Sequence, residues 1–340
     1  MERKLVTIRK ITEIIPIDGA DFIELAMIGG WQCVVKKGEF KVGDLGVYFE
    51  IDSFLPMRKE FEFLGKTKKI HTGEEGYRLR TMKLKGQLSQ GLLLPIDTFV
   101  ELKELDIDFE KDYSEDLDVM LWTTPLPVEL GGICRSTFPT HIIPKTDQER
   151  IQNLSRWFDK YPEVEFEETE KLDGMSVTYY IHEGEFAVCS RNQDLIEIEG
   201  NALWNMAKKL DLAEKMFAKG GNFAFQGELC GPGIQKNPLH LEEVDFFVYD
   251  IWDIEEQRYY TSKERVDLVT SLGLKHVPFN TVNVKILSKT MKEIIEYVKV
   301  KSIFGDFQRE GCVFKSINKV DGKIISFKAI NNDYLLKHGG

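Results

Sequence analysis

The sequence contains few cysteines, and their spacing argues against two common uses of this residue. Its 340 residues include five cysteines, at positions 33, 134, 189, 230 and 312. No Cys-x-x-Cys pair and no Cys/His cluster occurs, so neither a zinc site nor a disulfide framework is predicted. We therefore expect a reducing, intracellular compartment, either cytoplasmic or nuclear.

Long apolar runs are also missing. No stretch approaches the roughly 18 apolar residues of a membrane-spanning helix. The N-terminal MERKLVTIRKITEIIP lacks the apolar core of a secretory signal peptide. No phosphate-binding loop of the GxxxxGK[ST] type is present, and the Gly-Pro-Gly at 231–233 is interpreted as a turn. The sequence therefore predicts neither a membrane protein nor a P-loop enzyme.

Positive charge is scarce overall but concentrated in one stretch. The formal net charge of −11 argues against indiscriminate coating of nucleic acid. Between Arg58 and Lys85, however, nine Lys and Arg residues stand against four Glu residues. This local excess predicts a face that contacts phosphates, and an ordinary solvated surface is the alternative.

The first hundred residues predict a small β-barrel. Short runs rich in Val, Ile, Tyr and Phe, such as WQCVVKKGEFKVGDLGVYFEI and YRLRTMKL, are separated by Gly and Asp turns. Five or six strands in this length suit an OB-fold, a barrel that often binds single-stranded nucleic acid. Residues 101–142 are acidic at first and then rich in Pro and Gly, which is typical of a connecting segment.

A helix is predicted near the start of the second domain, residues 143–340. Thr146 and Glu149 have the spacing of a capping box, ahead of an amphipathic run that reaches Tyr161. Arg150 would then lie in the first turn, where a cation opposes the helix dipole. An anionic ligand would account for this arginine, and an ordinary surface arginine is the alternative.

Further along, strands alternate with helices. The expected strands include EFEETEKL, MSVTYYIHEG, EFAVCSRN, NFAFQGELCG and VDFFVYDIWD, and one expected helix covers residues 201–219. Hairpins such as the one around Glu183 and Gly184 favour antiparallel sheets. The predicted fold is therefore α+β, with a barrel followed by antiparallel sheets that helices flank.

Several short apolar stretches of the second domain carry unusual charged residues. Each alone is most simply a solvated residue at a strand edge, but the set and its order are informative. In chain order they are Lys171 to Gly174 (KLDG), Ser190 and Arg191, Gly227 and Glu228, the stretch FFVYD, Glu310 and Gly311, and Lys328 in SFKAIN.

This set resembles the motifs of the covalent nucleotidyltransferases, the superfamily of ATP-dependent ligases and capping enzymes with an ATP-grasp-like ligase domain. The match covers about residue 145 to the C-terminus. PKTDQERIQN, GGWQCVVKKGEFKVGDLGVYFEIDSFLP and SQGLLLP further resemble the RNA ligases with an N-terminal OB domain, typified by those of Naegleria and Deinococcus. About a dozen residues follow Lys328, which we interpret as leaving no room for the C-terminal OB domain of DNA ligases and capping enzymes.

The resemblance implies a role for each matched residue. Lys171 would attack the α-phosphorus of ATP, expel pyrophosphate and hold AMP as a phosphoramidate. Asp173, Glu228 and Glu310 would bind Mg²⁺ or Mn²⁺, directly or through its waters. The implied nucleotide-binding residues are Arg150 on the β- and γ-phosphates, Lys328 on the α-phosphate, Arg191 on the ribose or a phosphate, Glu170 beside the nucleophile, and Phe247 and Val313 on the two faces of adenine.

Two of these implied roles have open alternatives. Strand alternation makes Phe246 the competing choice for the residue that stacks on adenine. The final motif of the superfamily usually has a second lysine, but Ile330 stands at that position here. Lys323 or another cation would then have to take its place.

The acids around Lys171 pose a chemical problem. The attacking amine must be neutral, and bringing an ordinary lysine pKa of about 10.4 to near 7 requires about 4–5 kcal/mol of differential stabilisation. Nearby carboxylates favour the charged form instead. Strand alternation would place most acids of EFEETE on the solvent side. Asp173 would then face the site and recruit a cation that makes Lys171 reactive.

We therefore predict an ATP-dependent RNA ligase. It would join 3′-OH and 5′-phosphate RNA ends, most simply at nicks, through lysyl-AMP and an adenylylated 5′ end. RNA is the expected partner, and a monomer is the expected state. A DNA ligase or capping guanylyltransferase is the alternative enzyme. A non-catalytic RNA-binding protein is disfavoured because Lys171, Glu228 and Lys328 are all present.

Overall fold

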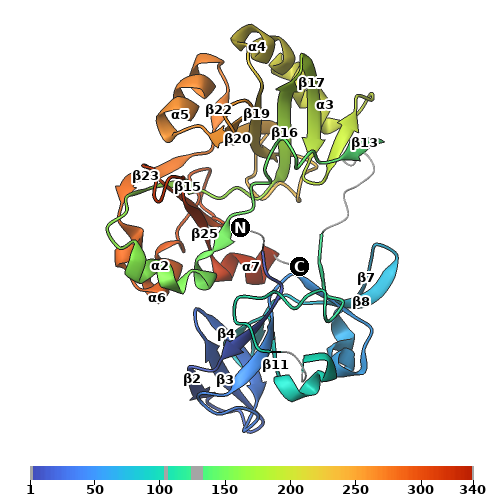
Figure 1. Cartoon of the computed structure of the whole chain (residues 1–340), viewed down its shortest axis with the longest axis vertical. Coiled ribbons are helices and arrows are strands. Elements are labelled where there is room, and N and C mark those ends of the chain that lie inside the picture. The colour runs from blue at the N-terminus through green and yellow to red at the C-terminus, as the bar shows by residue number, and fades with distance from the viewer. Residues whose placement is uncertain (1–2, 103–105, 124–132, 339–340) are drawn as a thin grey trace. The chain divides into compact units, whose positions relative to one another are not determined.

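The computed structural model describes residues 3–102, 106–123 and 133–338, and the chain divides into two compact units (Figure 1). Unit 1 contains Met1–Thr124, Glu149–Asp159 and Asn332–Gly340, and unit 2 contains Pro125–Gln148 and Lys160–Asn331. The expected boundaries at residues 100 and 142 differ from this division. The difference arises because the chain returns to unit 1 twice and because Tyr113, Leu117 and Val119 pack into the core of unit 1. Part of the expected connecting segment, residues 124–132, lies outside the described residues.

Unit 1 is built mainly from short antiparallel strands. Its sheets have the strand orders β1-β5-β11, β2-β3-β4, β12-β6-β8-β7 and β10-β9. The strands are β1 (Val6–Lys10), β2 (Glu13–Pro16), β3 (Ile23–Ile28), β4 (Trp31–Lys36), β5 (Leu45–Phe49), β6 (Ser53–Pro56), β7 (Lys68–His71), β8 (Glu74–Arg78), β9 (Thr81–Leu84), β10 (Gln87–Gln90), β11 (Leu92–Pro95), β12 (Met120–Leu121) and β14 (Glu149–Arg150). The expected strand YRLRTMKL is divided into β8 and β9, since Leu79 between them donates its N–H to Ser53 of β6.

The helix predicted from Thr146 and Glu149 is wrong. Residues 149–150 form β14, a 3-10 turn covers Ile151–Asn153, and helix α2 covers only Ser155–Lys160. The Thr146 hydroxyl contacts the Tyr249 hydroxyl at 2.9 Å instead of capping a helix. The Glu149 carboxylate accepts a hydrogen bond from the Asn153 side chain at 2.9 Å. Arg150 is therefore extended rather than helical, and the helix-dipole argument does not apply to it.

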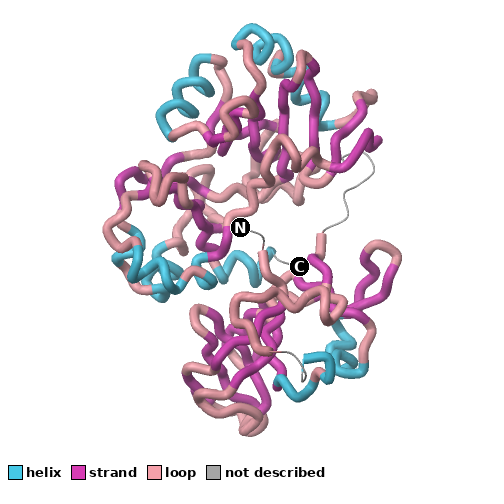
Figure 2. The backbone as a smooth tube through the Cα atoms, in the orientation of Figure 1, coloured by secondary structure: helices cyan, strands magenta, loops and turns pink. Residues whose placement is uncertain are grey.

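Unit 2 contains two mostly antiparallel sheets with helices beside them (Figure 2). The larger sheet has the order β13-β18-β17-β16-β19-β20-β21, with β22 parallel to β20, and in the smaller sheet β25, β24, β15 and β23 pair in that order. The strands are β13 (Ile133–Thr137), β15 (Phe166–Glu170), β16 (Met175–His182), β17 (Glu185–Ser190), β18 (Gln193–Ile196), β19 (Phe223–Cys230), β20 (Asp245–Asp253), β21 (Arg258–Tyr259), β22 (Lys275–His276), β23 (Phe279–Val284), β24 (Gly311–Ser316) and β25 (Ser326–Ile330).

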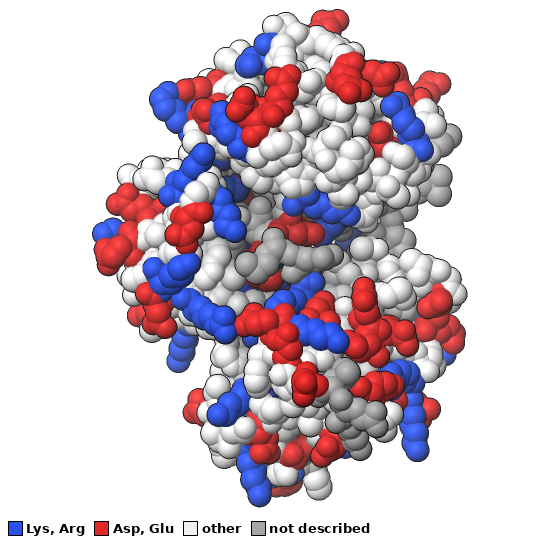
Figure 3. All heavy atoms as spheres, in the orientation of Figure 1, with Lys and Arg blue, Asp and Glu red and all other residues white. Residues whose placement is uncertain are grey.

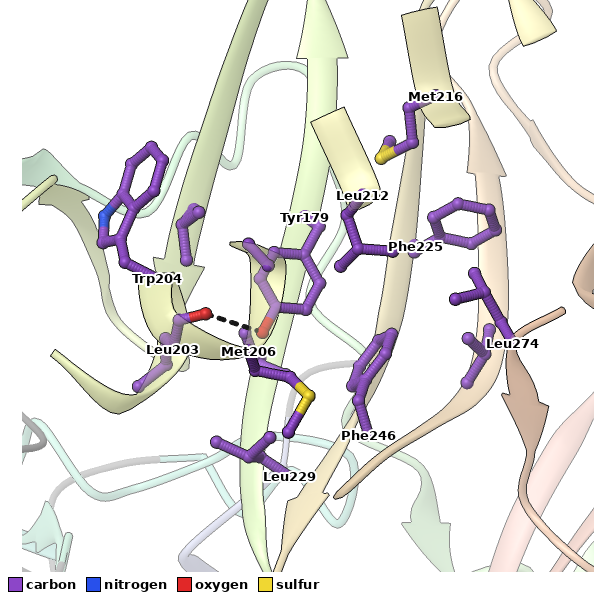
Figure 4. Packing of buried hydrophobic residues seen from close by; sticks show 14 of the residues in the cluster. Tyr179, Leu203, Trp204, Met206, Leu212, Met216, Phe225, Leu229, Phe246 and Leu274 are labelled. Carbon is purple, nitrogen blue, oxygen red and sulfur yellow. Dashed lines mark hydrogen bonds between the residues drawn. The ribbon is translucent and has the colours of Figure 1, made fainter. Parts of the chain in front are cut away.

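Helices α3 (Ala202–Lys209) and α4 (Leu212–Lys219) cover one face of the larger sheet. Figure 4 shows their apolar side chains packed on Tyr179, Phe225 and Phe246 of β16, β19 and β20. The single helix expected over 201–219 is thus two helices, because Asp211 adopts a left-handed conformation with φ of 52° between them. The remaining helices are α5 (Ser262–Ser271), α6 (Met291–Tyr297) and, in unit 1, α7 (Asn332–His338). Among the described residues, no helix is long and apolar enough to cross a membrane.

The acids of β15 are buried, which corrects the expectation that most of them face solvent. Glu167, Glu168 and Glu170 are each at most 2% exposed. β15 lies between β24 and β23, and each of the three carboxylates has a partner inside unit 2. Glu167 pairs with Arg265, Glu168 accepts hydrogen bonds from Tyr297 and Asn280, and Glu170 accepts them from the Ser302 hydroxyl and the Ile303 N–H. Alternation fails here because a strand covered on both faces must pair its charges rather than solvate them.

The pair of Glu167 and Arg265 predicts a large effect on stability. Arg265 of α5 is 2% exposed, and its loss would leave the Glu167 carboxylate buried without its cation. We expect Arg265→Ala to lower the free energy of unfolding by about 3–5 kcal/mol. On the same helix, Lys263→Ala removes only an exposed pair with Asp267 and should change it by less than about 0.5 kcal/mol. Urea unfolding followed by tryptophan fluorescence compares the two variants, and equal midpoints would contradict the prediction.

Candidate active site

Lys171 directly follows β15 and lies against the start of β24. Its backbone N–H donates to the Gly311 carbonyl at 3.0 Å, and its Nζ donates to the Glu310 carboxylate at 2.7 Å. The β15–β24 pairing, in which Glu170 lies opposite Cys312, brings these residues together across 139 positions of sequence. Two motifs that were recognised separately in the sequence thus meet at one ion pair.

Glu228 joins this group through the larger sheet. The β16–β19 register places Ser176 opposite Glu228, and the Gly174 N–H donates to the Glu228 carboxylate at 3.1 Å. Gly174 is required here by space, since a Cβ would lie 2.4 Å from the Leu229 carbonyl oxygen and 2.6 Å from the Cys230 sulfur. The glycine of KLDG therefore lets the chain pass close to β19 and fixes the distance between Lys171 and Glu228.

The charges in this group strongly affect one another. Burial acts to lower the pKa of Lys171, but the carboxylates of Glu310, Glu228 and Asp173 outweigh it and raise that pKa above its ordinary value. Burial, with the nearby charges of Glu310 and Asp173, raises the pKa of Glu228 to about 8. Burial and Asp173 also raise the pKa of Glu310. Three carboxylates around one lysine make a site with excess negative charge. An added cation would reduce the repulsion among these carboxylates.

The donor set suits a divalent ion held through water. Within residues 3–102, 106–123 and 133–338, no group of three His, Cys, Asp or Glu side chains is placed to coordinate a metal ion directly. The Asp173 carboxylate is nevertheless close enough to raise the pKa of Glu228 and of Glu310. Mg²⁺ is reluctant to lose its water shell and commonly keeps several waters in proteins. Of the two predicted modes, binding through water therefore fits the residues better than direct binding.

The two phenylalanines of FFVYD lie on opposite faces of β20. Phe246 is in the core beneath α3 and α4, where its ring makes an edge contact with Tyr179 at 4.9 Å. Phe247 lies opposite Glu228 in the β19–β20 register and packs with Leu172, the residue after Lys171, and with Phe304. The contact with Leu172 makes Phe247 the better candidate of the two for a nucleotide contact.

Val313 and Lys328 lie side by side on neighbouring strands. They are direct partners in the β24–β25 register, and the Lys328 charge is close enough to influence the Glu310 carboxylate. Lys323 is exposed in the loop that precedes β25. Lys315 of β24 is buried, but its Nζ already donates to the Asp250 carboxylate at 2.6 Å. Of these three lysines, Lys328 is the one with an electrostatic link to the site carboxylates.

Arg191 and Glu170 differ in their exposure and in their hydrogen-bond partners. Arg191 is exposed and holds both carboxylate oxygens of Asp147, at 2.7 and 3.0 Å. The Glu170 side chain is buried, and its carboxylate already accepts hydrogen bonds from Ser302 and Ile303. A ligand could therefore reach Arg191 by displacing Asp147, whereas the Glu170 carboxylate has a structural role.

Arg150 belongs to unit 1, unlike the other predicted site residues. It is buried, its guanidinium lies 5.7 Å from the centre of the Trp31 ring, and Asp52 is 4.0 Å away. Burial and the charge of Arg3 lower its pKa. Its Nε and Nη1 atoms have no hydrogen-bond partner in the part of the chain that the structure describes. Such unsatisfied donors are costly, and an anion would satisfy them.

The sequence did not predict the neighbours of Arg150. Arg3 and Arg78 each lie 3.6 Å from Asp52, so three arginines converge on that carboxylate. The positions involved, 3, 52, 78 and 150, share no motif or spacing. Only the folded arrangement of unit 1 shows that they form a group.

Comparisons with known proteins now bear on both units. A family model described as an OB-fold domain matches residues 5–96, and one described as RNA ligase matches residues 164–330. Solved structures of Naegleria gruberi RNA ligase match the chain at 43% identity over 99% of its length. The structure of an Asp-to-Ala variant without ligand matches the present structure with a TM-score of 0.92, and the match covers 98% of the variant's chain. A Lys-to-Ala variant with ATP and Mn and the protein with pyrophosphate each have a TM-score of 0.91 and are covered over 99%.

This chain belongs to the RNA ligases with an N-terminal OB-fold domain. No curated protein matches it. The membership confirms the predicted fold class and the predicted enzyme class, an ATP-dependent RNA ligase. Every predicted site residue of this ligase except Arg150 falls inside the matched range 164–330.

Proposed function

We propose that this RNA ligase seals nicks with a 3′-OH and a 5′-phosphate in RNA duplexes, using ATP and Mg²⁺ or Mn²⁺. The observation that carries the proposal is the group of Lys171, Asp173, Glu228 and Glu310, a single amine among three carboxylates. An amine nucleophile placed this way suits transfer of a nucleotidyl group through a covalent intermediate. The relatives solved with ATP, AMP and Mn support the choice of nucleotide and ion.

The reaction has three balanced displacements at phosphorus. First, the neutral Lys171 amine bonds to the α-phosphorus of ATP and pyrophosphate leaves. Next, an oxygen of the RNA 5′-phosphate attacks that phosphorus, the P–N bond breaks, and Lys171 regains a proton. Finally, the RNA 3′-OH attacks the 5′-phosphorus, loses its proton and displaces AMP. Lys171 is thus the covalent residue of the first two steps only.

The site carboxylates would hold the divalent ion through its waters. When bound, the ion supplies positive charge that favours the neutral form of Lys171 and stabilises charge on the α-phosphate. Asp173, Glu228 and Glu310 are suited to orient water ligands because the charge of Asp173 reaches both glutamates and that of Glu310 reaches Glu228. Their mutual repulsion keeps the site attractive to a cation.

The neighbouring residues would bind the nucleotide. Phe247 and Val313 provide the apolar contacts for adenine, because Phe247 packs against the residue next to Lys171 and Val313 lies beside Lys328. Lys328 provides a cation for the α-phosphate. Arg191 would exchange Asp147 for the ribose or a phosphate, and Glu170 would position Lys171 from the preceding residue.

Arg150 remains our candidate for the β- and γ-phosphates. The support comes from its unsatisfied Nε and Nη1 donors and from Arg3 and Arg78 nearby. Arginine suits this role because its planar fork matches phosphate oxygens. The reason for the choice is now the convergence of arginines rather than a helix dipole.

The partner and the setting follow from the same proposal. Unit 1 would bind the RNA duplex as an OB-fold module, unit 2 would carry out adenylyl transfer, and the chain would act as a monomer. All five cysteines are free, and four of them are buried. Free thiols are typical of a reducing compartment, which supports an intracellular location.

Nick sealing provides the test of the substrate. With a 5′-labelled RNA strand, we expect a nicked duplex to be sealed at least about tenfold faster than the same ends free in solution, because the template holds the 3′-OH near the 5′-phosphate. Equal rates for both substrates would contradict the proposal. Replacing the 3′-OH strand by DNA in the same duplex distinguishes RNA ligation from DNA ligation. In a separate experiment, covalent labelling of the protein by GTP but not by ATP would favour a capping reaction.

A further inference from the structure

The structure divides the basic stretch Arg58–Lys85 into two parts. Figure 3 shows basic and acidic side chains interspersed over the visible face of the chain, without one continuous basic field. Arg58 pairs with Glu101 at 2.7 Å, Lys68 pairs with Glu75 at 2.7 Å, and Arg78 lies 3.6 Å from Asp52. The charges of Arg58 and Lys68 are thus balanced within unit 1, and Arg78 belongs to the group of arginines around Asp52.

Of the six remaining cations, three lie on one β-hairpin, whereas Lys59, Lys66 and Lys69 lie in the 3-10 segment Lys59–Thr67 and in β7. Arg80 precedes β9, Lys83 lies within it, and Lys85 forms the turn to β10. All three are exposed. Within the described residues, no carboxylate oxygen lies within 4.0 Å of their charged nitrogen atoms. The Arg80 charge also acts to lower the pKa of Arg78. The hairpin therefore carries net positive charge that no acid of the described chain neutralises.

The hairpin is a firmly held ribbon. Its register runs from Thr81 opposite Gln90 to Leu84 opposite Gln87, and the turn residues Lys85 and Gly86 have φ of 47° and 81°. Two-residue turns with positive φ at both positions match the natural twist of a hairpin. A ribbon of this kind holds Lys83 and the turn residue Lys85 in fixed positions near each other.

Its base is anchored to the rest of unit 1. The Gln90 side chain donates to Asn332 of α7 at 3.1 Å, and the Tyr48 hydroxyl donates to the Gln90 carbonyl at 3.0 Å. The Val34 N–H of β4 donates to the Ser89 hydroxyl at 3.0 Å. These contacts hold β10, so the exposed strand β9 and the turn present their side chains outward.

Apolar side chains alternate with the cations. Met82 and Leu84 flank Lys83 on β9, and both are exposed. Because successive side chains of a strand point to opposite faces, Met82 and Leu84 lie on the opposite face of the ribbon from Lys83. The face that carries Lys83 suits RNA phosphates. By contrast, a pocket elsewhere in unit 1 is lined by Glu74, Glu75, Glu115 and Asp118 and would repel phosphate. Within unit 1, the hairpin is therefore better suited to nucleic acid than this acidic pocket.

We infer that the β9–β10 hairpin binds the sugar–phosphate backbone of the RNA duplex through Arg80, Lys83 and Lys85. The inference rests on the proposed function, since it names the part of unit 1 that holds the nicked substrate. A-form RNA offers a wide, shallow minor groove bordered by phosphates, which a two-stranded ribbon can follow. The contacts are ionic and independent of sequence, so binding depends strongly on salt.

Binding to a fluorescent nicked RNA duplex, measured by anisotropy from 50 to 200 mM NaCl, tests the hairpin. The double variant Lys83→Ala, Lys85→Asn removes two cations, and asparagine tolerates the positive φ of residue 85. We expect about tenfold weaker binding and a slope of log K against log salt that is smaller in magnitude by about two. The matched control Lys36→Ala, Lys37→Asn removes two exposed lysines of unit 1 outside the hairpin and should leave the slope unchanged.

Self-adenylylation separates the hairpin from the active site. The hairpin variant should form lysyl-AMP at the wild-type rate, which also shows that it is folded. An unchanged salt slope in this variant would overturn the hairpin inference, and so would an equal loss in the control. If the wild-type enzyme seals free ends as fast as nicks, the proposed function fails instead. The two ideas thus fail by different measurements.

Discussion

Lys171→Ala is expected to abolish labelling of the protein by α-³²P ATP. The Lys171 amine donates to Glu310 at 2.7 Å, and Glu228 and Asp173 are close enough to influence its charge. Loss of a covalent nucleophile typically lowers rates by about 10⁴-fold or more. Lys171→Arg should fail as well, because a guanidinium stays charged and cannot attack. Phosphorimaging of denaturing gels after incubation with ATP and Mg²⁺ or Mn²⁺ measures the label.

The last chemical step provides the control for this variant. In the proposed mechanism, Lys171 carries AMP only until the RNA 5′ end is adenylylated. The Lys171→Ala protein should therefore still seal a nick whose 5′ end is already adenylylated, without ATP. Normal labelling of Lys171→Ala would show that another residue is the nucleophile. Loss of both activities would show that the substitution disrupts the site as a whole.

The sequence predicted several charged residues that the fold brings together, because each belongs to a short local motif. Lys171, Glu228 and Glu310 were recognised from their immediate neighbours, and the fold brings them together through strand pairing. The two-part α+β architecture also followed from local features, since turns and β-branched runs mark strands. What local patterns predicted poorly was the environment of each charged residue.

The buried acids of β15 illustrate the limit. Alternation would assign them to solvent, but the partner of Glu167 is Arg265, 98 residues away. Arg150 is similar, because its neighbours Trp31 and Asp52 lie about a hundred positions earlier in the chain. The partners of a charge across such separations depend on the completed fold. A local motif can therefore nominate a reactive residue, but it does not predict which distant side chains surround that residue.

Glu310 is expected to have two opposing effects on the protonation of the Lys171 amine, one without a divalent ion and one with it. Without a metal ion, its carboxylate accepts a hydrogen bond from the Lys171 amine at 2.7 Å and helps to hold a proton on it. With a divalent ion bound through water, the same carboxylate would help to position the positive charge that disfavours that proton. The residue would thus keep Lys171 inactive in the absence of the ion and support its attack in the presence of the ion.

This double role predicts a steep dependence on divalent ion and pH. With the pKa of Lys171 raised above its ordinary value, fewer than about one molecule in 10³ has a neutral amine at pH 7. Removing the ion with EDTA should therefore slow lysyl-AMP formation by about 10³-fold or more. The residual rate should rise about tenfold per pH unit, since pH lies below the raised pKa and each unit increases the neutral fraction tenfold. Single-turnover labelling from pH 6 to 9.5 measures both effects.

Glu310→Gln separates the two effects by their sign. Without the ion, the variant loses a carboxylate that raises the pKa of Lys171, so its rate profile should shift to lower pH and its rate at a given pH should increase. With Mg²⁺ or Mn²⁺ present, the same variant should be slower than the wild type. Glu185→Gln, an exposed change on β17, should match the wild type in both conditions. If Glu310→Gln slowed both reactions by one factor, Glu310 would not hold the proton on Lys171, and the reactivity of the lysine would have to be controlled by Glu228 or Asp173 instead.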